Sequence, residues 1–456
     1  MNAAGALFAR HALLPEGWRH DVLLEWDAHG DLAAATPDAP APAGVERATY
    51  VVPGMVNLHS HAFQRALGGL TERAGDGQDS FWTWRALMYR FANRISPDQV
   101  EAIAAQLYAE CLRHGYTAVC EFHYLHRAPD GAPYAAPAEM ALRIARAAQA
   151  GGIGLTLLPV LYAWAGFQDM PLRPEQRRFR SDPDQVLDIV AALEPLRGPQ
   201  LEAGAAPHSL RAASSAQLRA LAQGLPAGRP LHIHVAEQQA EVAQCLDATG
   251  RRPVEYLMEQ VAVDARWCLV HATHLADHEV GMLAASGAVA GLCPTTEANL
   301  GDGLFPLEPY LQAGGRFGIG SDSHVSHSPV EELRWLEYGQ RLVLQRRNIA
   351  VDGRQRDVAA FLWTQALAGG AQAAGRRVGQ LRVGHRADLL VLDDLHPNLD
   401  GADTGEVLGR FLFCGNDNLV RDVLAGGRWA VRGGRHVDQD GIARRYAAAM
   451  RELRAA

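Results

Sequence analysis

Between residues 51 and 370 the sequence alternates apolar strand-like runs with segments of helical periodicity, and this alternation constrains the fold more than any other feature. Eight strand-then-helix units over about 300 residues are typical of a (β/α)8 barrel, which builds its active site at the carboxyl ends of its strands. The predicted strands are Gly54–His59, Thr117–His123, Gly154–Leu161, Leu201–Pro207, Pro230–Val235, Trp267–His271, Ala288–Cys293 and Arg316–Gly320. The predicted helices are Pro97–His114, Pro137–Gln149, Asp184–Leu193, Ala216–Leu221, Glu237–Ala248 and Asp277–Ala285.

The two ends of the chain read differently, as short strands broken by turns. Neither end is long enough to fold alone, so we expect them to pair into one small β-sandwich domain beside the barrel. The strand candidates are Ala6–Leu13, Asp21–Trp26, a segment after residues 29–31, Arg386–Asp393 and Arg421–Val437. The predicted division is 1–50 and 371–456 for the two parts of the β-domain and 51–370 for the barrel.

The composition indicates which kinds of binding partner are not expected. Of the 456 residues, 48% are hydrophobic and 21% are charged, which is ordinary for a globular enzyme. The formal net charge is −8 and there is no dense basic run, so neither nucleic acid nor an anionic membrane is an expected partner. The six cysteines never form a Cys-x-x-Cys pair, which favours free buried thiols in a reducing compartment. With no signal peptide or membrane-spanning run, a cytoplasmic location is expected.

Ionisable side chains gather where the predicted strands end. His59 and His61 are two residues apart on a strand and therefore face the same side, where two imidazoles can bind one metal ion. A single histidine of this kind is more often a hydrogen-bonded structural residue. The set is larger than chance would give, and jointly it predicts a metal site: His59, His61, His123, His126, His208, His232, His234, His271, His274 and His324, with Glu121, Glu237, Glu297 and Asp322.

This pattern resembles the amidohydrolase superfamily, whose barrels take metal ligands from the first, fifth and eighth strands. The resemblance covers nearly the whole chain and implies His59, His61, His234 and Asp322 as ligands, with His232 facing away and packing. No lysine occurs near the end of the third or fourth strand to form a bridging carbamate, so one divalent ion is favoured over two. Zinc is the first choice for such nitrogen and oxygen ligands, with iron as the alternative.

Three residues suit the chemistry of such a site. A divalent ion lowers the pKa of its bound water toward neutrality. Asp322 beside that water can accept its proton, and His271 can orient it by hydrogen bonding. Glu237, three residues after His234, can deliver a proton to a departing nitrogen. The alternative for Glu237 is a carboxylate that stabilises a helix N-terminus.

The loops carry residues that suit carboxylate recognition. A guanidinium binds a carboxylate through paired donors, and two arginines with a tyrosine and a glutamine fit that purpose better than a neutral base. For Arg85 and Arg211 taken singly, a surface or salt-bridged role is equally plausible. The predicted substrate-binding residues are Gln64, Arg85, Tyr124, His208 and Arg211.

Six segments in order resemble one family, the N-formimino-L-glutamate deiminases of bacterial histidine degradation. They are residues 59–65, 121–126, 206–211, 232–238, 292–301 and 321–325. The resemblance implies hydrolysis of the formimino group of N-formimino-L-glutamate to N-formyl-L-glutamate and ammonia, and a homodimer is common in such families. A small-molecule dicarboxylate is thus the expected partner. We also expect one of two long loops, Trp82–Arg90 or Tyr162–Arg180, to close over the substrate.

Two other functions compete with this one. Another amidohydrolase would act on a heterocycle, as guanine, cytosine and adenosine deaminases or triazine hydrolases do. A non-catalytic relative would keep the barrel as a scaffold, but such a protein would be expected to have lost some of the groups that act on a substrate. All six are present: His59, His61, His234, Glu237, His271 and Asp322.

Overall fold

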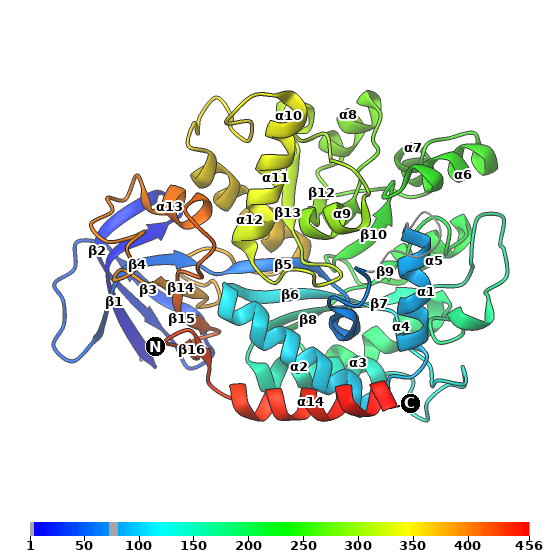
Figure 1. Cartoon of the computed structure of the whole chain (residues 1–456), viewed down its shortest axis with the longest axis horizontal. Coiled ribbons are helices and arrows are strands. Elements are labelled where there is room, and N and C mark those ends of the chain that lie inside the picture. The colour runs from blue at the N-terminus through cyan, green and yellow to red at the C-terminus, as the bar shows by residue number, and fades with distance from the viewer. Residues whose placement is uncertain (1–3, 73–80, 456) are drawn as a thin grey trace.

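Parallel strands form the centre of the computed structural model, which describes residues 4–72 and 81–455 (Figure 1). β5 to β8 pair in chain order with β9 beside β7, and β10 to β13 form a second parallel set. Backbone bridges between Ala205 and Leu231 and between Ser60 and Asp322 join the two sets at both edges, so the strands close into a ring. This confirms the predicted (β/α)8 architecture. The strands are β5 (Met55–Ser60), β6 (Tyr116–His123), β7 (Gly154–Leu161), β8 (Leu201–Ala203), β9 (Ala206–Pro207), β10 (Leu231–Val235), β11 (Trp267–His271), β12 (Val289–Leu292) and β13 (Arg316–Ile319).

Burial explains why the barrel strands could be recognised in the sequence. Every residue of β5, β6 and β7 is buried, because one face of each strand lines the barrel interior and the other lies under helices. The predicted fourth strand is interrupted, and β8 and β9 are its two parts. Gly204 lies between them, where a Cβ atom would collide with the carbonyl oxygen of Pro230.

Helices surround this ring (Figure 1). In α2, Ser96 and Gln99 cap the helix start reciprocally, and Gly115 ends the helix with a φ of 104°. The helices are α1 (Phe81–Ala92), α2 (Pro97–His114), α3 (Glu139–Gly151), α4 (Pro183–Leu193), α5 (Ser215–Gly224), α6 (Gln239–Thr249), α7 (Pro253–Gln260), α8 (Asp277–Ser286), α9 (Pro294–Leu300), α10 (Leu307–Gln312), α11 (Pro329–Leu344) and α12 (Val358–Ala374), with 3-10 turns η1 (Ala62–Leu67), η2 (Pro174–Gln176) and η3 (Glu194–Leu196). The sequence did not predict α1, α7 or α9 to α12.

α12 packs directly on the backbone of β13 and β5. A Cβ atom at Gly369 would collide with the carbonyl oxygen of Phe317 in β13. Glycine inside a helix is unfavourable by about 1 kcal/mol relative to alanine, so its presence here reflects the close approach of helix and strand.

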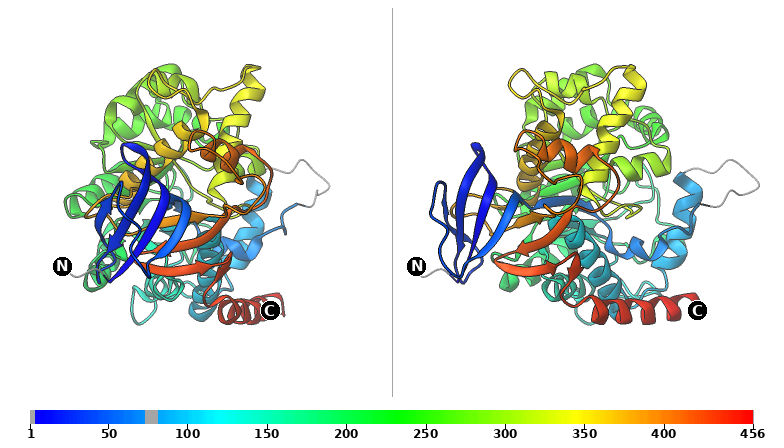
Figure 2. Two further views of the ribbon diagram at one scale, coloured as in Figure 1. Left: turned by 90° about the vertical axis from the view of Figure 1, so that its left-hand side faces the viewer. Right: turned by 60° about the vertical axis from the view of Figure 1, so that its left-hand side comes forward.

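The two ends of the chain share one eight-stranded sheet, in the order β17-β16-β15-β14-β4-β1-β2-β3 (Figure 2). β4 joins the ends, since it pairs in parallel with β1 and antiparallel with β14. The sheet folds over on itself: the amides of Gly384 and Ala387 donate to the carbonyl oxygens of Leu32 and Gly30. It encloses a hydrophobic cluster of its own. The strands are β1 (Gly5–Leu14), β2 (Gly17–Trp26), β3 (Leu32–Thr36), β4 (Glu46–Pro53), β14 (Leu389–Leu392), β15 (Val420–Ala425), β16 (Arg428–Arg432) and β17 (Arg435–His436).

A small β-domain from both chain ends is therefore confirmed. The boundaries at residues 50 and 370 remain a prediction; β4, which the sequence did not predict, runs across the first of them. Two further helices lie in the C-terminal part, α13 (Val407–Phe413) and α14 (Gln439–Ala455), and α14 packs against α2 (Figure 1). These were also missed.

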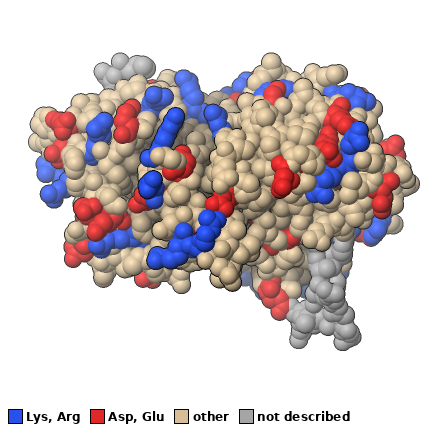
Figure 3. Space-filling view, turned by 90° about the horizontal axis from the view of Figure 1, so that it is seen from above, with Lys and Arg blue, Asp and Glu red and all other residues tan. Residues whose placement is uncertain are grey.

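The distribution of surface charge and the state of the cysteines match what the composition predicts. Basic and acidic side chains are interspersed over the face seen in Figure 3. All six cysteines are free; five are buried, and Cys414 is exposed. Within the described ranges, no helix has the length and apolar character needed to cross a membrane.

Candidate metal centre and substrate pocket

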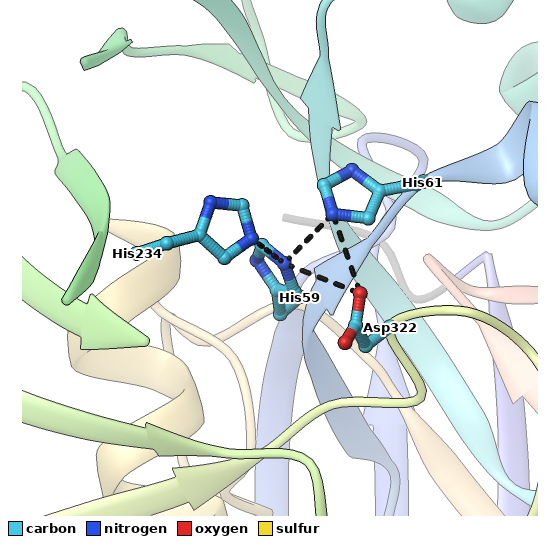
Figure 4. A group of neighbouring side chains, drawn as sticks. All are labelled: His59, His61, His234 and Asp322. Atoms are coloured by element: carbon cyan, nitrogen blue, oxygen red, sulfur yellow. Dashed lines mark hydrogen bonds and ion pairs between the residues drawn. The ribbon is translucent and has the colours of Figure 1, made fainter. Parts of the chain in front are cut away.

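Three histidines and one aspartate meet at the carboxyl ends of the barrel strands (Figure 4). His59 lies in β5 and His61 directly follows it; His234 lies in β10, and Asp322 follows β13. The amide of Asp322 donates to the carbonyl oxygen of His59 at 3.0 Å, and the amide of His61 donates to that of Asp322 at 3.3 Å. None of the four residues is more than 5% exposed. The main chain thus brings together four residues that the sequence separates widely.

The Nε2 atoms of the three histidines point toward one another. His59 Nε2 lies 3.1 Å from His61 Nε2 and 3.0 Å from His234 Nε2. Asp322 Oδ1 lies 3.3 Å from His61 Nε2 and 3.6 Å from His59 Nε2. Ligands placed about 2.0–2.2 Å from one central ion would be spaced in this way.

Backbone carbonyl groups determine which ring nitrogen carries the proton. The Nδ1 atom of His61 lies 2.9 Å from the carbonyl oxygen of Phe122, and that of His234 lies 3.0 Å from the carbonyl oxygen of His208. A carbonyl oxygen only accepts, so each Nδ1 donates and each Nε2 keeps a lone pair directed at the centre of the cluster.

The charge states also fit a cation. Burial and the neighbouring imidazoles lower the pKa of His59 well below its usual value, and burial lowers the pKa of His61 to about 3. Neutral imidazole is the form that binds metal. Burial raises the pKa of Asp322 to about 7; the carboxyl groups of Glu237 and Glu297 add to the rise, whereas His271 opposes it. Three neutral imidazoles and a carboxylate suit a single divalent ion of the zinc or iron type.

His271 lies beside Asp322 and is surrounded by carboxyl groups. Its Nε2 atom is 3.7 Å from Asp322 Oδ2 and 3.8 Å from Glu237 Oε1, and its Nδ1 atom is 3.2 Å from Glu297 Oε1. Burial lowers the pKa of His271, but Glu237, Glu297 and Asp322 outweigh it and raise the pKa to about 10. His271 and Asp322 have φ angles of 65° and 46°, in the left-handed region that few non-glycine residues adopt.

A pocket opens directly from this cluster. All five predicted substrate-binding residues line it, together with the predicted catalytic residues. The lining consists of His61, Gln64, Trp84, Arg85, Met88, Tyr89, Tyr124, Tyr162, Phe179, His208, Arg211, His234, Glu237, His271, Leu300 and Asp322.

Two guanidinium groups make one part of this pocket positive. Arg211 is 9% exposed, and its Nε atom has no hydrogen-bond partner among the described residues. Arg85 lies over the ring of Tyr89 at 5.5 Å; burial lowers its pKa, and the charge of Arg211 lowers it further. The two positive charges repel each other; the carboxyl group of Glu241 acts on Arg211, and an anionic ligand would add to this compensation.

Not every polar strand end reaches the pocket. His232, two residues before His234 in β10, bonds the carbonyl oxygen of Ala373 in α12 at 2.8 Å and does not reach the cluster, as expected for a packing residue. His126 bonds the carbonyl oxygen of Val160, and His324 lies between Ser60 and Ser321. These histidines support the barrel and do not line the pocket.

One expectation was wrong. Trp82–Arg90 is not a loop but most of α1, whose residues Trp84, Arg85, Met88 and Tyr89 line one wall of the pocket. The helical spacing of these positions was the signal that could have revealed it. Tyr162 and Phe179 lie within the predicted loop Tyr162–Arg180 and line the pocket, although neither was predicted individually. Leu300 was missed, because it is an apolar position whose contacts depend on the tertiary fold.

Comparison with known proteins agrees with this geometry. The family model described as "Amidohydrolase family" matches residues 50–430. The chain belongs to the amidohydrolase family. In this metal-dependent family the cluster of His59, His61, His234 and Asp322 lies where a metal site is expected. A second model, "Formimidoylglutamate deiminase HutF, N-terminal domain", matches residues 4–49.

Individual relatives show which members of the amidohydrolase family this chain is similar to. A formimidoylglutamate deiminase from Pseudomonas aeruginosa is 54% identical over 449 residues, which cover 98% of this chain and 99% of the relative. The crystal structure of an amidohydrolase from Brucella melitensis superposes with a TM-score of 0.93 at 44% identity, covering 98% and 99% of the two chains. An adenosine deaminase from Xanthomonas campestris with bound zinc shares the fold, with a TM-score of 0.80 at 22% identity over 99% and 98%. The resemblance to the formimidoylglutamate deiminases is confirmed.

Proposed function

We propose that this amidohydrolase hydrolyses N-formimino-L-glutamate to N-formyl-L-glutamate and ammonia, a step of histidine degradation. The observation that carries the proposal is the pairing of two features in one pocket: a cluster suited to a divalent cation, and the guanidinium groups of Arg85 and Arg211. A substrate with two carboxylates and a hydrolysable C=N group requires both. The high identity to a formimidoylglutamate deiminase supports the same choice over a heterocycle deaminase.

The cation in this proposal is one Zn²⁺, with Fe²⁺ as the alternative, held by His59, His61, His234 and Asp322. When bound, it supplies Lewis-acid chemistry that makes a water molecule acidic near neutral pH. The neutral imidazoles and the main-chain bonds of His59 and Asp322 prepare the site for it.

The reaction adds the oxygen of water to the formimino carbon and breaks the bond from that carbon to the departing nitrogen. Asp322, whose Oδ2 is turned toward His271, accepts the proton of the water. Glu237 carries a proton to the departing nitrogen, which leaves as ammonia. His271 directs its Nε2 atom at the space between these two carboxyl groups and orients the reacting groups by hydrogen bonding.

The glutamate portion is held by Gln64, Arg85, Tyr124, His208 and Arg211. Gln64 Nε2 donates to the Tyr124 hydroxyl at 2.8 Å, so these two side chains are oriented before a ligand arrives. The Oε1 atom of Gln64 has no partner among the described residues. Guanidinium groups supply paired donors that match a carboxylate.

The test is ammonia release by metal-loaded protein, with N-formimino-L-glutamate beside adenosine, guanine and cytosine. Turnover of the first compound alone is expected. Turnover of a heterocycle in its place would be compatible with the proposed metal site, but it would contradict the proposal that the two arginines bind carboxylates. A cytoplasmic homodimer remains our prediction for the assembly, and analytical ultracentrifugation of the purified protein tests the dimer.

A further inference from the structure

Glu297 contacts the side of His271 that faces away from the substrate. The two ring nitrogens of His271 have different neighbours: Nε2 faces Asp322 and Glu237, whereas Nδ1 lies 3.2 Å from Glu297 Oε1. Glu297 is 4% exposed, His271 is 1% exposed, and Glu297 does not line the pocket. Glu297 therefore does not contact a ligand in the pocket directly, and His271 is the pocket residue that its carboxyl group touches.

The carboxyl group of Glu297 is itself held in place. Its Oε1 atom accepts the amide of Cys293 at 2.9 Å, in addition to the contact with His271. The main-chain amide of Glu297 donates to Cys293, and its carbonyl oxygen accepts the amide of Asp302, both at 2.9 Å. An acceptor fixed in this way can select the orientation of a neighbouring ring.

The helix that carries Glu297 is also anchored. In α9, the amide and the hydroxyl of Thr295 donate to Glu332 at 2.9 and 2.6 Å. The hydroxyl of Thr296 lies 3.2 Å from the carbonyl oxygen of Ser321, the residue before Asp322. This bond links the helix that carries Glu297 to the segment that carries Asp322.

We infer that Glu297 is a positioning residue for the proposed deimination: it accepts the Nδ1–H of His271 and so holds the ring with Nε2 directed at Asp322 and Glu237. A carboxylate partner of a ring N–H fixes the orientation of the imidazole. Without Glu297, the buried ring would lose the acceptor that holds its Nδ1 side. The inference rests on the proposed function only for its effect on turnover.

A second metal ion is the competing explanation for this group. His271, Cys293 and Glu297 each offer one ligand atom, all within 4.8 Å of one another. The Oε1 atom of Glu297 already accepts the Cys293 amide and lies 3.2 Å from His271 Nδ1, so it has partners without a metal ion. The number of metal ions per chain decides between the two.

The kinetic test compares Glu297→Gln and Glu297→Ala with Glu332→Gln. Glu332 is a matched control, because it is a buried carboxyl that anchors the same helix without touching His271. We expect kcat to fall about 10-fold in Glu297→Gln and about 100-fold in Glu297→Ala, with KM within about twofold and one metal ion per chain throughout. Glu332→Gln should keep kcat within about threefold. Equal losses in both positions, or one metal ion fewer in Glu297→Ala than in the wild type, would overturn the inference.

A second readout does not depend on turnover. Proton NMR of the zinc-loaded protein labelled with ¹⁵N-histidine should show a downfield Nδ1–H signal that His271→Asn removes. We expect this signal to persist in Glu332→Gln and to vanish in Glu297→Ala. An unchanged signal in Glu297→Ala would contradict the inference, even if the wild type were found to act on another substrate. Absence of ammonia release by the wild type would contradict only the proposed function.

Discussion

The main-chain amide of Asp322 donates a hydrogen bond to the carbonyl oxygen of His59, with 3.0 Å between the nitrogen and the oxygen. This bond joins the end of the first barrel strand, β5, to the segment after the last one, β13. The backbone therefore places the side chain of Asp322 beside His61.

This arrangement allows the acid–base role of Asp322 to be tested separately from folding. Asp322→Asn keeps the size of the side chain and all main-chain bonds, but it removes the carboxylate that accepts a proton. We expect kcat to fall by about 10²–10⁴-fold. Ammonia release measures this, with thermal unfolding as the control for an intact fold and metal content as the control for an occupied site. Activity within about tenfold of the wild type would show that another group accepts the proton.

Two histidines on the same strand separate metal binding from packing. His234 reaches the cluster, whereas His232, two residues earlier in β10, bonds the carbonyl oxygen of Ala373. His234→Ala should lose bound metal, as measured by inductively coupled plasma mass spectrometry after dialysis. His232→Ala should keep the metal but lower the free energy of unfolding by about 1–3 kcal/mol, because a buried carbonyl loses its donor. Retention of metal in His234→Ala would remove it from the ligand set.

Removal of the cation should abolish activity without unfolding the chain, since the cluster lies on strands that are packed independently of it. Dialysis against a chelator is expected to stop ammonia release, and one equivalent of Zn²⁺ or Fe²⁺ per chain should restore it. Circular dichroism should be nearly unchanged between the two forms. Full activity of metal-free protein would contradict the proposed chemistry.

Arg211 should determine affinity for the dicarboxylate. Arg211→Met keeps the apolar part of the side chain but removes the charge, and truncating one partner of a buried charge pair costs about 2–5 kcal/mol, so KM should rise at least about 30-fold. Arg219→Met, an exposed change on α5, is the matched control and should leave KM unchanged. Equal KM values for wild type and Arg211→Met would exclude a contact between Arg211 and substrate.

Two glycines in helices should respond oppositely to alanine. At Gly281 in α8 no atom lies within 4 Å of an added Cβ atom, so Gly281→Ala should stabilise the protein by up to about 1 kcal/mol. At Gly369 the added atom meets the backbone of Phe317, so Gly369→Ala should destabilise it by about 1–3 kcal/mol. Chemical denaturation compares the two. Stabilisation by Gly369→Ala would show that α12 can move away from β13.

The barrel and the centre of the site could be predicted because both leave local signals. Buried strands such as β7 read as continuous apolar runs, and the ligand pair at His59 and His61 follows from the two-residue period of a strand. The same period places His232 and His234 on one side of β10, so it could not show that only His234 reaches the cluster. Strand ends that converge in a barrel then bring Asp322 and His271 to one place.

Other features depend on contacts between distant segments. α1 was mistaken for a loop because its aromatic and arginine residues suggest a ligand-binding segment, and tertiary packing decides its conformation. α14 is a polar helix that packs on α2, a contact that no local pattern specifies. Glu297 could be seen near a strand end, but its contact with Nδ1 of His271 depends on how α9 begins.

The most direct test of the central claim is mass spectrometry of the product formed from N-formimino-L-glutamate by metal-loaded protein in H₂¹⁸O. We predict ammonia release together with one ¹⁸O atom in the formyl group of N-formyl-L-glutamate and none in its carboxylates. Absence of ammonia and of labelled product, with a heterocycle deaminated by the same preparation, would contradict the claim that this pocket joins a hydrolytic metal site to a dicarboxylate site.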